Sequence, residues 1–374
     1  MTIERRDFLK QAAATTALGL TLPTSRILGA NDRVRIGIIG PGARGQELMR
    51  EFVKAPNLEF VALSDVYNAR FDQAKKLLSE TGQNTANVKT FTDHRKMLEM
   101  KDLDAVIVCT ENALHREAVE LAARAGCHIL CEKPIATTIK DTFAMREAVS
   151  QAGVNFMTAF PMRFDPSVIL ARDRIKAGDL GRVYGVNGIN HSVIPQAHRA
   201  WFTQKALAGG GAVMDHTVHL LDLYRWMFNT EVLEVYAEVS NPFYPDVEVD
   251  TAGIVTLKLS NGMFAGIDCS WSRPTTYPTW GHLKLEVVGE RGSLEVDAFA
   301  QHLIVTTVKA NSRNQNWHGW GSDPNKAMLE EFFASITEAR EPSVTWQDGF
   351  EAMRVALICY ESARIGQPVK LEHV

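Results

Sequence analysis

The feature that most constrains this chain is a glycine-rich turn that directly follows a short apolar strand. Residues 34–39 are mostly apolar and β-branched, which is typical of a strand buried on both faces of a parallel sheet. They lead into residues 40–45, which read G-P-G-A-R-G and match the pattern G-x-G-x-x-G. Residues 46–53 follow as a predicted helix with Leu48 and Phe52 on one face. Strand, turn and helix in this order predict a site for the phosphates of a dinucleotide.

The residues of the turn have distinct physical roles in such a site. Gly40 permits the tight turn, Gly42 lets the backbone approach a pyrophosphate, and Gly45 allows the helix to pack closely on the strand. The start of the helix, which includes Ala43 and Arg44, offers free N–H groups and the positive end of the helix dipole. We therefore expect all five residues to bind the cofactor.

An acidic residue completes the dinucleotide-binding pattern. A second predicted strand, residues 59–64, ends at Asp65, which lies 20 residues after Gly45. A carboxylate there accepts hydrogen bonds from a ribose 2′-OH and repels a 2′-phosphate, so it favours NAD over NADP. The alternative is a solvent-facing aspartate at a strand end. Because the whole unit is in register, the sequence predicts NAD as the cofactor.

The N-terminal 30 residues resemble a twin-arginine export signal. Arg5 and Arg6 begin the run R-R-D-F-L-K, a mild apolar stretch covers residues 11–22, and cleavage is expected after Ala30. This predicts a periplasmic protein. The alternative is an amphipathic N-terminal arm on a cytoplasmic protein.

Length and charge limit the remaining classes of function. A chain of 374 residues is too long for one ordinary core, which favours two domains. The formal net charge of −4 gives no basic footprint for nucleic acid, and no apolar run is long enough for a membrane anchor. The five cysteines form no C-x-x-C pair, and we expect no metal site.

The pattern of elements predicts where the two domains lie. From residue 31 to residue 155, predicted strands and helices alternate, as in an α/β domain with a doubly wound parallel sheet of the Rossmann type. Its ligand crevice lies at the carboxyl ends of the strands, where residues 110–112 (Thr-Glu-Asn) and 132–134 (Glu-Lys-Pro) fall.

Residues 156–374 predict a second α/β domain for substrate binding and oligomerisation. Successive strands with few helices between them indicate a large, open, mostly antiparallel sheet. Asn261 and Gly262 are expected to form a two-residue hairpin turn. Two helices close the chain, and the last of them, which ends at Gly366, could pack back on the first domain.

Several polar residues in these segments are candidates for chemistry. Lys133 follows a buried strand, where its ammonium can bind a substrate hydroxyl and stabilise negative charge on that oxygen. Asp215, His219 and Asp222 follow a triple glycine at spacings of four and three residues, so they share one face of a predicted helix. The set could hold a metal, although zinc sites usually contain more histidine or cysteine. It also suits proton transfer by an imidazole that a neighbouring aspartate orients. A solvent-facing polar helix is a further alternative.

On these motifs the chain resembles the Gfo/Idh/MocA family of NAD(P)-dependent sugar and polyol oxidoreductases from residue 31 to the C-terminus. The matching segments are 40–45, 132–134, G-G-G-x-x-x-D-x-x-x-H-x-x-D at 209–222, R-F-D-P at 163–166 and S-A-R-x-G at 362–366. The resemblance implies a Rossmann domain followed by an α/β domain whose open sheet commonly forms a dimer. A homodimer or homotetramer is therefore expected.

The resemblance also implies roles for individual residues. Lys133, Asp215 and His219 are implied to be catalytic and to contact the substrate. Asn112 and His115 are implied to lie along the cofactor, and the Lys133–Pro134 bond is implied to be cis. Thr110, Glu132 and Lys133 are further expected cofactor contacts, because they fall in the predicted crevice.

One segment departs from the family pattern. Residues 160–163 read Phe-Pro-Met-Arg instead of a Tyr-Asn-Arg-Arg-like run. This departure leaves Arg163 as the candidate substrate contact of the segment.

These expectations lead to one main hypothesis of function and two alternatives. The main one is NAD(P)-dependent oxidation of a secondary hydroxyl of a sugar, polyol or glycoside, with His219 as base, Lys133 orienting the hydroxyl and Asp215 positioning the imidazole or the sugar. Exported branches of the family, of the glucose–fructose oxidoreductase and NAD-dependent glycosidase types, instead keep the dinucleotide through a closed redox cycle. The third hypothesis is a non-enzymatic sensor of NAD or sugar.

Overall fold

The computed structural model describes residues 33–52, 58–197, 199–279, 281–300, 302–309, 312–319, 321 and 323–371. The predicted export signal, residues 1–30, lies outside these ranges. None of the described helices combines the length and the apolar composition needed to cross a membrane.

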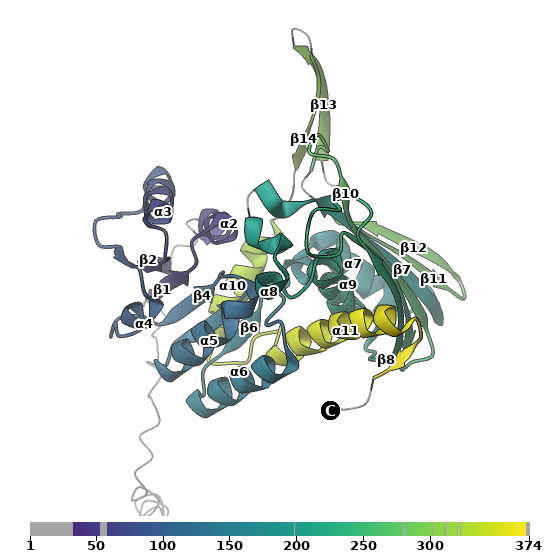
Figure 1. Cartoon of the computed structure of the whole chain (residues 1–374), viewed down its shortest axis with the longest axis horizontal. Helices are drawn as coiled ribbons and strands as arrows, with labels where there is room; N and C mark the ends of the chain where they lie inside the picture. Colours follow the sequence, from purple (N-terminus) through teal and green to yellow (C-terminus); the bar gives the residue numbers. More distant parts are fainter. Residues whose placement is uncertain are drawn as a thin grey trace, which may run out of the picture.

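The first domain is a three-layer α/β unit, drawn in purple and blue in Figure 1. Within the described residues its sheet has the order β3-β2-β1-β4-β5-β6, and every neighbouring pair is parallel. The strands are β1 (Val34–Ile39), β2 (Leu58–Ser64), β3 (Lys89–Phe91), β4 (Ala105–Val108), β5 (His128–Cys131) and β6 (Phe156–Thr158). The helical segments are α2 (Ala43–Phe52), α3 (Asn68–Glu80), α4 (His94–Met97), η1 (Asn112–Leu114), α5 (His115–Arg124) and α6 (Ile139–Ala152). This is the predicted doubly wound fold, whose strand order reverses between β1 and β4 and opens a crevice there.

The second domain packs helices on one face of a larger sheet, whose order is β12-β11-β7-β10-β9-β8-β15 within the described residues. Only β10 and β7 pair in parallel, so the sheet is mixed and mostly antiparallel, as predicted. Its strands are β7 (Val183–Val193), β8 (Val232–Ser240), β9 (Ala252–Leu259), β10 (Phe264–Arg273), β11 (Gly281–Gly289), β12 (Gly292–Asp297) and β15 (Val369–Lys370). The helical segments are η2 (Pro161–Phe164), α7 (Pro166–Lys176), η3 (Pro195–Ala197), η4 (Ala200–Thr203), α8 (Lys205–Ala208), α9 (Ala212–Phe228), α10 (Pro324–Thr337) and α11 (Trp346–Ile365).

A two-stranded hairpin projects from the second domain at the top of Figure 1. It consists of β13 (His302–Lys309) and β14 (Ser312–Gly319), which pair in antiparallel register. The sequence did not predict this hairpin.

The last two helices join the domains (Figure 1). In α10, Phe333 packs its ring 5.1 Å from that of Phe52 in α2. In α11, the indole of Trp346 donates a hydrogen bond to the carbonyl of Thr142 in α6 at 3.0 Å and stacks on Phe350. The main cluster of buried apolar side chains therefore runs through both domains, which fixes the crevice between them.

Two boundaries differ from the expectations. Strand β6 belongs to the first sheet, so the first domain continues past residue 155. Residues 260–263 connect β9 and β10, and the loop inside the last hydrogen bond contains three residues, because Leu259 rather than Ser260 bonds to Met263. The N–H of Gly262 donates to the carbonyl of Leu259, and Gly262 has a φ of 83°. A left-handed glycine at the end of the loop is typical of three-residue hairpins.

Candidate active site

The predicted cofactor residues follow four strands that are neighbours in the first sheet. Asp65 follows β2, the glycine turn follows β1, Thr110 follows β4 and Glu132 follows β5. The sheet order β2-β1-β4-β5 therefore places them in one row along the carboxyl edge, where a dinucleotide binds in this fold.

The glycines of the turn meet the steric demands that the sequence predicted. Gly40 has a φ of 84°, and a Cβ there would lie 2.8 Å from the carbonyl of Cys109 after β4. A Cβ on Gly45 would lie 2.9 Å from the carbonyl oxygen of Gly40. A Cβ on Gly42 would meet nothing within 4 Å, so this backbone faces open space. Gly42 is thus the glycine that a pyrophosphate can approach.

Asp65, after β2, and Thr110, after β4, place polar side chains on either side of the glycine turn. The Asp65 carboxylate is half-buried and accepts a hydrogen bond from the N–H of Tyr67 at 2.9 Å. Burial raises its pKa from the usual value, although this hydrogen bond opposes the shift. The hydroxyl of Thr110 is buried and has no hydrogen-bond partner among the described residues. An orphaned buried hydroxyl in the crevice indicates a missing ligand.

Two of the expected cofactor contacts have protein partners instead. His115 is fully buried, with Nδ1 3.0 Å from the carbonyl of Pro134 and Nε2 3.1 Å from the carbonyl of Thr110. Burial lowers its pKa. The side-chain amide of Asn112 donates to the carbonyl of Ala208 in α8 at 2.9 Å. These side chains fix the crevice loops to each other, and the structure does not present either ring nitrogen of His115 to a cofactor.

Arg44 and Glu132 form a largely buried ion pair between two separate strand ends. Nε of Arg44 lies 2.6 Å from Oε1 of Glu132, and Nη1 lies 3.2 Å from the more exposed Glu47. Burial alone would raise the pKa of Glu132, but the Arg44 guanidinium lowers it overall, so the carboxylate stays charged. The bridge crosses the end of β4, which lies between β1 and β5.

The triple glycine lets distant residues cap the N-terminus of α9. Oδ1 and Oδ2 of Asp250 accept hydrogen bonds from the N–H groups of Gly211 and Val213, both at 2.8 Å. The Tyr360 hydroxyl donates to Asp250 and accepts from the N–H groups of Gly211 and Met214. A Cβ on Gly211 would lie 1.8 Å from the Asp250 carbonyl oxygen. Only glycine permits this approach, and the cap orients the first turn of α9.

That first turn carries Asp215, which pairs with Lys133 across the two domains. Nζ of Lys133 lies 2.7 Å from Oδ1 of Asp215, and each side chain is 15% exposed. Burial would raise the pKa of Asp215, but the Lys133 ammonium holds it well below its usual range. The other carboxylate oxygen accepts from the indole N–H of Trp271 at 3.3 Å and lies 3.7 Å from Nε2 of His216. The cis Lys133–Pro134 bond implied by the resemblance is present.

His219 lies one turn further along α9 and is half-buried. Its Nδ1 is buried without a hydrogen-bond partner among the described residues, and its ring meets Phe160 edge-on at 5.9 Å. Burial, helped by the Lys133 ammonium, lowers the pKa of His219 well below its usual value, which keeps the imidazole neutral. Asp215 hydrogen-bonds Lys133 and Trp271, so its carboxylate positions the lysine, and its predicted role of positioning the imidazole or the sugar stays a prediction.

The structure gives Arg163 and Asp222 a different task from the one expected. Nε of Arg163 donates to Asp222 at 2.8 Å, Nη2 pairs with Asp222 and with Asp348, and Nη1 donates to the carbonyl of Ser343. The side chains of Arg163 and Asp222 are 5% and 1% exposed. These contacts use four of the five N–H groups of Arg163 inside the protein, and its predicted substrate contact stays a prediction. Burial raises the pKa of Asp222 to about 6, although Arg163 opposes this.

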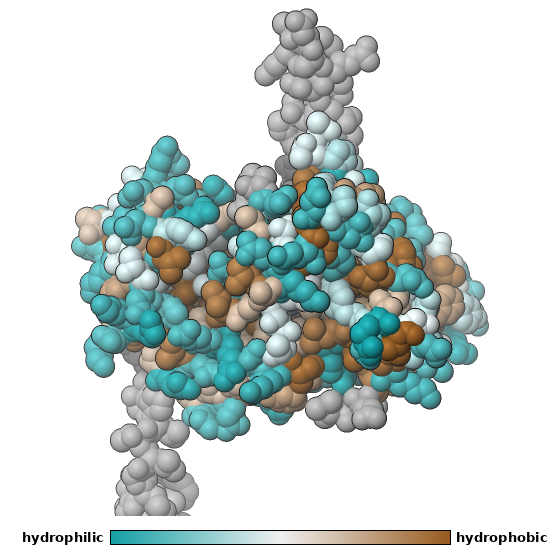
Figure 2. Space-filling model, in the orientation of Figure 1, coloured by the Kyte–Doolittle hydropathy of each residue, from teal (hydrophilic) through white to brown (hydrophobic). Residues whose placement is uncertain are grey.

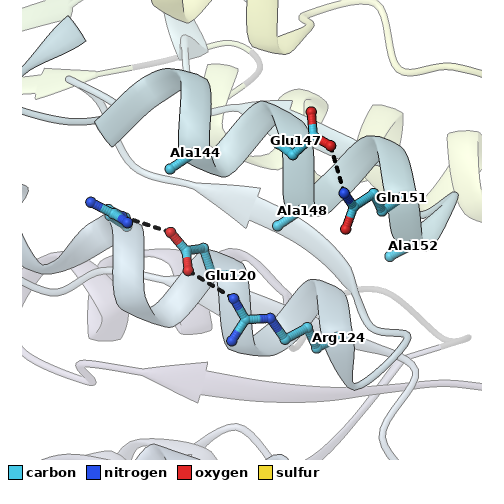
Figure 3. Close-up of a pocket in the computed structure, with 8 residues that line it drawn as sticks. Glu120, Arg124, Ala144, Glu147, Ala148, Gln151 and Ala152 are labelled. Atoms are coloured by element: carbon cyan, nitrogen blue, oxygen red, sulfur yellow. Dashed lines mark hydrogen bonds and ion pairs between the residues drawn. The ribbon is translucent and has the colours of Figure 1, made fainter. Parts of the chain in front are cut away.

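One surface hollow lies away from this crevice. A groove of about 420 Å³ runs between α5 and α6, where the side chains of Ala144, Ala148 and Ala152 line one wall (Figure 3). Ion pairs of Glu120 with Arg116 and Arg124 line the other wall. No site residue lines this groove. In the part of the chain that the structure describes, no three His, Cys, Asp or Glu side chains are placed to hold a metal ion.

Sequence reasoning missed His216, Trp271, Asp250 and Tyr360. His216 is adjacent to Asp215, but on a helix adjacent residues point in different directions, so its contact with the carboxylate had no sequence signal. Trp271, Asp250 and Tyr360 come from β10, the loop before β9 and α11, and only the tertiary structure brings them to α9.

A Rossmann domain with a lysine–aspartate pair and a neutral histidine at its crevice defines a two-domain, NAD-binding oxidoreductase. Residues 34–160 match an oxidoreductase family with an NAD-binding Rossmann fold, and residues 168–295 match the GFO/IDH/MocA C-terminal domain. The chain belongs to the Gfo/Idh/MocA family of oxidoreductases.

The relatives include dehydrogenases of sugars and inositols. Levoglucosan dehydrogenase of Pseudarthrobacter phenanthrenivorans is 31% identical over 88% of this chain and 96% of its own length. The scyllo-inositol 2-dehydrogenase (NAD(+)) of Bacillus subtilis is 26% identical over 91% of this chain and 97% of its own length. A crystal structure of an aldose–aldose oxidoreductase from Caulobacter crescentus, complexed with glycerol, superposes with a TM-score of 0.75. It is 27% identical and covers 91% of this chain and 100% of that chain.

The residues present fit NAD. Open space above Gly42, the orphaned hydroxyl of Thr110 and the carboxylate of Asp65 lie along the path that a dinucleotide takes in this fold. The chain is an NAD-dependent enzyme whose family acts on CH–OH groups.

Proposed function

We propose that this enzyme oxidises a secondary hydroxyl of a sugar, polyol or glycoside, with Lys133, Asp215 and His219 as its catalytic residues. The observation that carries the proposal is the 2.7 Å pair between Lys133 and Asp215, which lies beside a neutral, half-buried imidazole. A lysine that a carboxylate holds in place presents a fixed cation to a substrate oxygen. A neutral imidazole can accept a proton at neutral pH.

The reaction removes a hydride from the carbinol carbon and a proton from its oxygen, and leaves a ketone. NAD supplies the acceptor for the hydride and its two electrons when it is bound. Lys133 donates a hydrogen bond to the substrate oxygen and stabilises the negative charge that develops there. The unpartnered Nδ1 of His219 accepts the proton, which gives this buried nitrogen a hydrogen-bonding partner when substrate is present.

The replacement of His219 by alanine tests this assignment. Loss of a general base typically lowers the rate 10²–10⁴-fold, so kcat should fall in that range on a panel of inositols, aldoses and glycosides. The dissociation constant for NADH should change less than about threefold, because His219 lies on the second domain. Undiminished turnover would refute the role of His219. Because its pKa lies well below 6.5, the acidic limb of kcat/KM in the parent enzyme should also begin below pH 6.5.

A closed redox cycle is the second candidate function. The aldose–aldose oxidoreductase that superposes on this chain supports it, as does the export signal expected at residues 1–30, since free NAD is not regenerated outside the cytoplasm. We therefore propose that an enzyme with this closed redox cycle is located in the periplasm. Purified enzyme should then release about one equivalent of NAD(H) on denaturation, even after long dialysis. Protein that holds no cofactor and binds NAD weakly and reversibly would support an ordinary dehydrogenase.

We also propose that the enzyme is a homodimer or homotetramer that associates through the outer face of the large sheet. Val288, Gly185 and Phe264 are register neighbours across β11, β7 and β10. The Phe264 ring lies over Gly185 and is 65% exposed, and Val288 is 53% exposed. Exposed apolar rows of this kind favour a protein partner.

A further inference from the structure

The ion pair between Arg44 and Glu132 has a placement that helix stability does not explain. Arg44 is the second residue of α2, in the first turn, where the helix dipole disfavours a cation. Its guanidinium leaves the helix surface and reaches Glu132, which directly follows β5. The two side chains are only 17% and 10% exposed. A buried pair of this kind is weak as a source of stability, so a role in the site is the better reason for it.

The pair lies close enough to the catalytic residues for their charges to interact. Glu132 directly precedes Lys133 in the chain, the Lys133 ammonium helps to lower the pKa of Glu132, and Arg44 helps to lower the pKa of His219. If Lys133 holds the substrate oxygen, the nicotinamide must lie beside it, because hydride transfer requires reacting atoms in contact. The other end of the bridge is in the phosphate-binding turn. A dinucleotide bound in the crevice would therefore have Arg44 near its phosphates and Glu132 near its nicotinamide.

Charges at this position act differently on the two oxidation states of the cofactor. The nicotinamide ring is cationic in NAD⁺ and neutral in NADH, so a nearby cation disfavours NAD⁺ and a nearby anion favours it. As a matched pair, Arg44 and Glu132 largely cancel at the ring. Lys133, the residue after Glu132, forms a second matched pair with Asp215, so its charge is balanced in the same way.

We propose that the Arg44–Glu132 pair balances the affinities of the enzyme for NAD⁺ and NADH, which suits a cofactor held through both halves of a redox cycle. This inference rests on the proposed function, since it uses Lys133 to locate the reacting end. It adds a role for two residues whose charges take no part in the proton transfer.

The test compares Glu132→Gln, Arg44→Met and the double variant. The measured quantity is the ratio of the dissociation constants of NAD⁺ and NADH, from NADH fluorescence and competition by NAD⁺. Glu132→Gln leaves a cation and should raise this ratio roughly tenfold, which is the effect of a unit charge about 10 Å away at an effective dielectric constant of about 20. Arg44→Met leaves an anion and should lower the ratio by a similar factor. The double variant should return close to the parent ratio.

Glu47→Gln is the matched control, because Glu47 also contacts Arg44 but is exposed. Its ratio should stay within about twofold of the parent. Arg44→Gln replaces Arg44→Met if the latter does not fold. If the cofactor is too tightly bound for titration, the midpoint potential of the bound cofactor replaces the ratio, at about 30 mV per tenfold change.

Two results would overturn the inference: both single variants shifting the ratio in the same direction, or neither shifting it. In either case the parent enzyme would still oxidise its substrate with NAD. A parent enzyme that binds neither NAD⁺ nor NADH would instead refute the proposed function itself.

Discussion

At His216, folding buries an ionisable side chain without a strong hydrogen-bonded counter-charge. Its Nε2 lies 3.1 Å from the Ser192 hydroxyl and 3.7 Å from Asp215, and its side chain is almost fully buried. Burial lowers its pKa to about 4, although Asp215 opposes the shift. The site therefore contains two histidines, His216 and His219, that the fold keeps neutral.

This burial predicts that stability depends on pH. Between pH 6.5 and about 4, the unfolded chain protonates His216 and the folded chain does not, so the unfolded state binds more protons. Stability is then fully present above pH 6.5 and is lost as the pH falls through this window, by up to about 1.4 kcal/mol per pH unit for this residue. Urea unfolding at intervals from pH 4.5 to 8 should show the slope.

The variant His216→Gln should lose that part of the slope. At pH 8 the imidazole is neutral in both states, so a difference between parent and variant there reports only packing and hydrogen bonding. If the free energy of unfolding falls equally steeply with pH in the two proteins below pH 6.5, the assignment to His216 is contradicted.

At the scale of elements, the site depends on how the N-terminus of α9 is held. The helix has no side-chain cap of its own at Gly211, and Asp250 and Tyr360 supply the cap from other elements. The sequence predicted the helix and the face that carries Asp215 and His219, because helical periodicity is local. It did not predict the cap, because a residue 39 positions away in the chain provides it.

Removal of this cap should weaken both folding and catalysis. Asp250→Ala leaves the N–H of Val213 without its acceptor and leaves the N–H of Gly211 only the Tyr360 hydroxyl, which should lower the free energy of unfolding by about 2 kcal/mol. Because Asp215 sits in the same turn, kcat should fall more than KM rises. Chemical denaturation and steady-state kinetics measure the two effects. Tyr360→Phe keeps the Asp250 cap, so it should lower the free energy of unfolding and kcat by less than Asp250→Ala does. Equal losses in the two variants would contradict the leading role of Asp250.

At the scale of the whole molecule, no helix among the described residues covers the outer face of the large sheet. Helices α9 and α11 cover the inner face of the large sheet, while Phe264 and Val288 lie exposed on the outer face. In Figure 2, brown hydrophobic residues are scattered among teal and white ones over the face in view, and the outer helices of the first domain are mostly teal. An exposed apolar row on a regular sheet favours association of two copies across a twofold axis.

This surface predicts an oligomer that charge can disrupt. Phe264→Lys combined with Val288→Lys should shift the protein toward the monomer in light scattering coupled to size exclusion. The inner-face core is untouched, so the far-ultraviolet spectrum should remain that of the parent. A parent protein that is monomeric at micromolar concentration, or a variant with unchanged mass, would contradict an interface on this face.

The sequence by itself determined the features that depend on neighbours in the chain. Glycine positions, strand length and helical spacing located the dinucleotide turn, the acid after β2, Lys133 and the helix of Asp215 and His219, because backbone sterics and periodicity act over a few residues. The alternation of strands and helices, followed by a run of strands, also determined the class and order of the two domains.

Only the tertiary structure decided which polar groups are partners. Arg163 was expected to meet a substrate and instead pairs with Asp222 and Asp348, and His115 was expected to meet the cofactor and instead lies between backbone carbonyls. The contact of Asp215 with Lys133 was likewise not predicted, because it joins two domains. The physical reason is that a buried polar group must bind whichever partner the packed elements bring close, and elements distant in the sequence supply those partners.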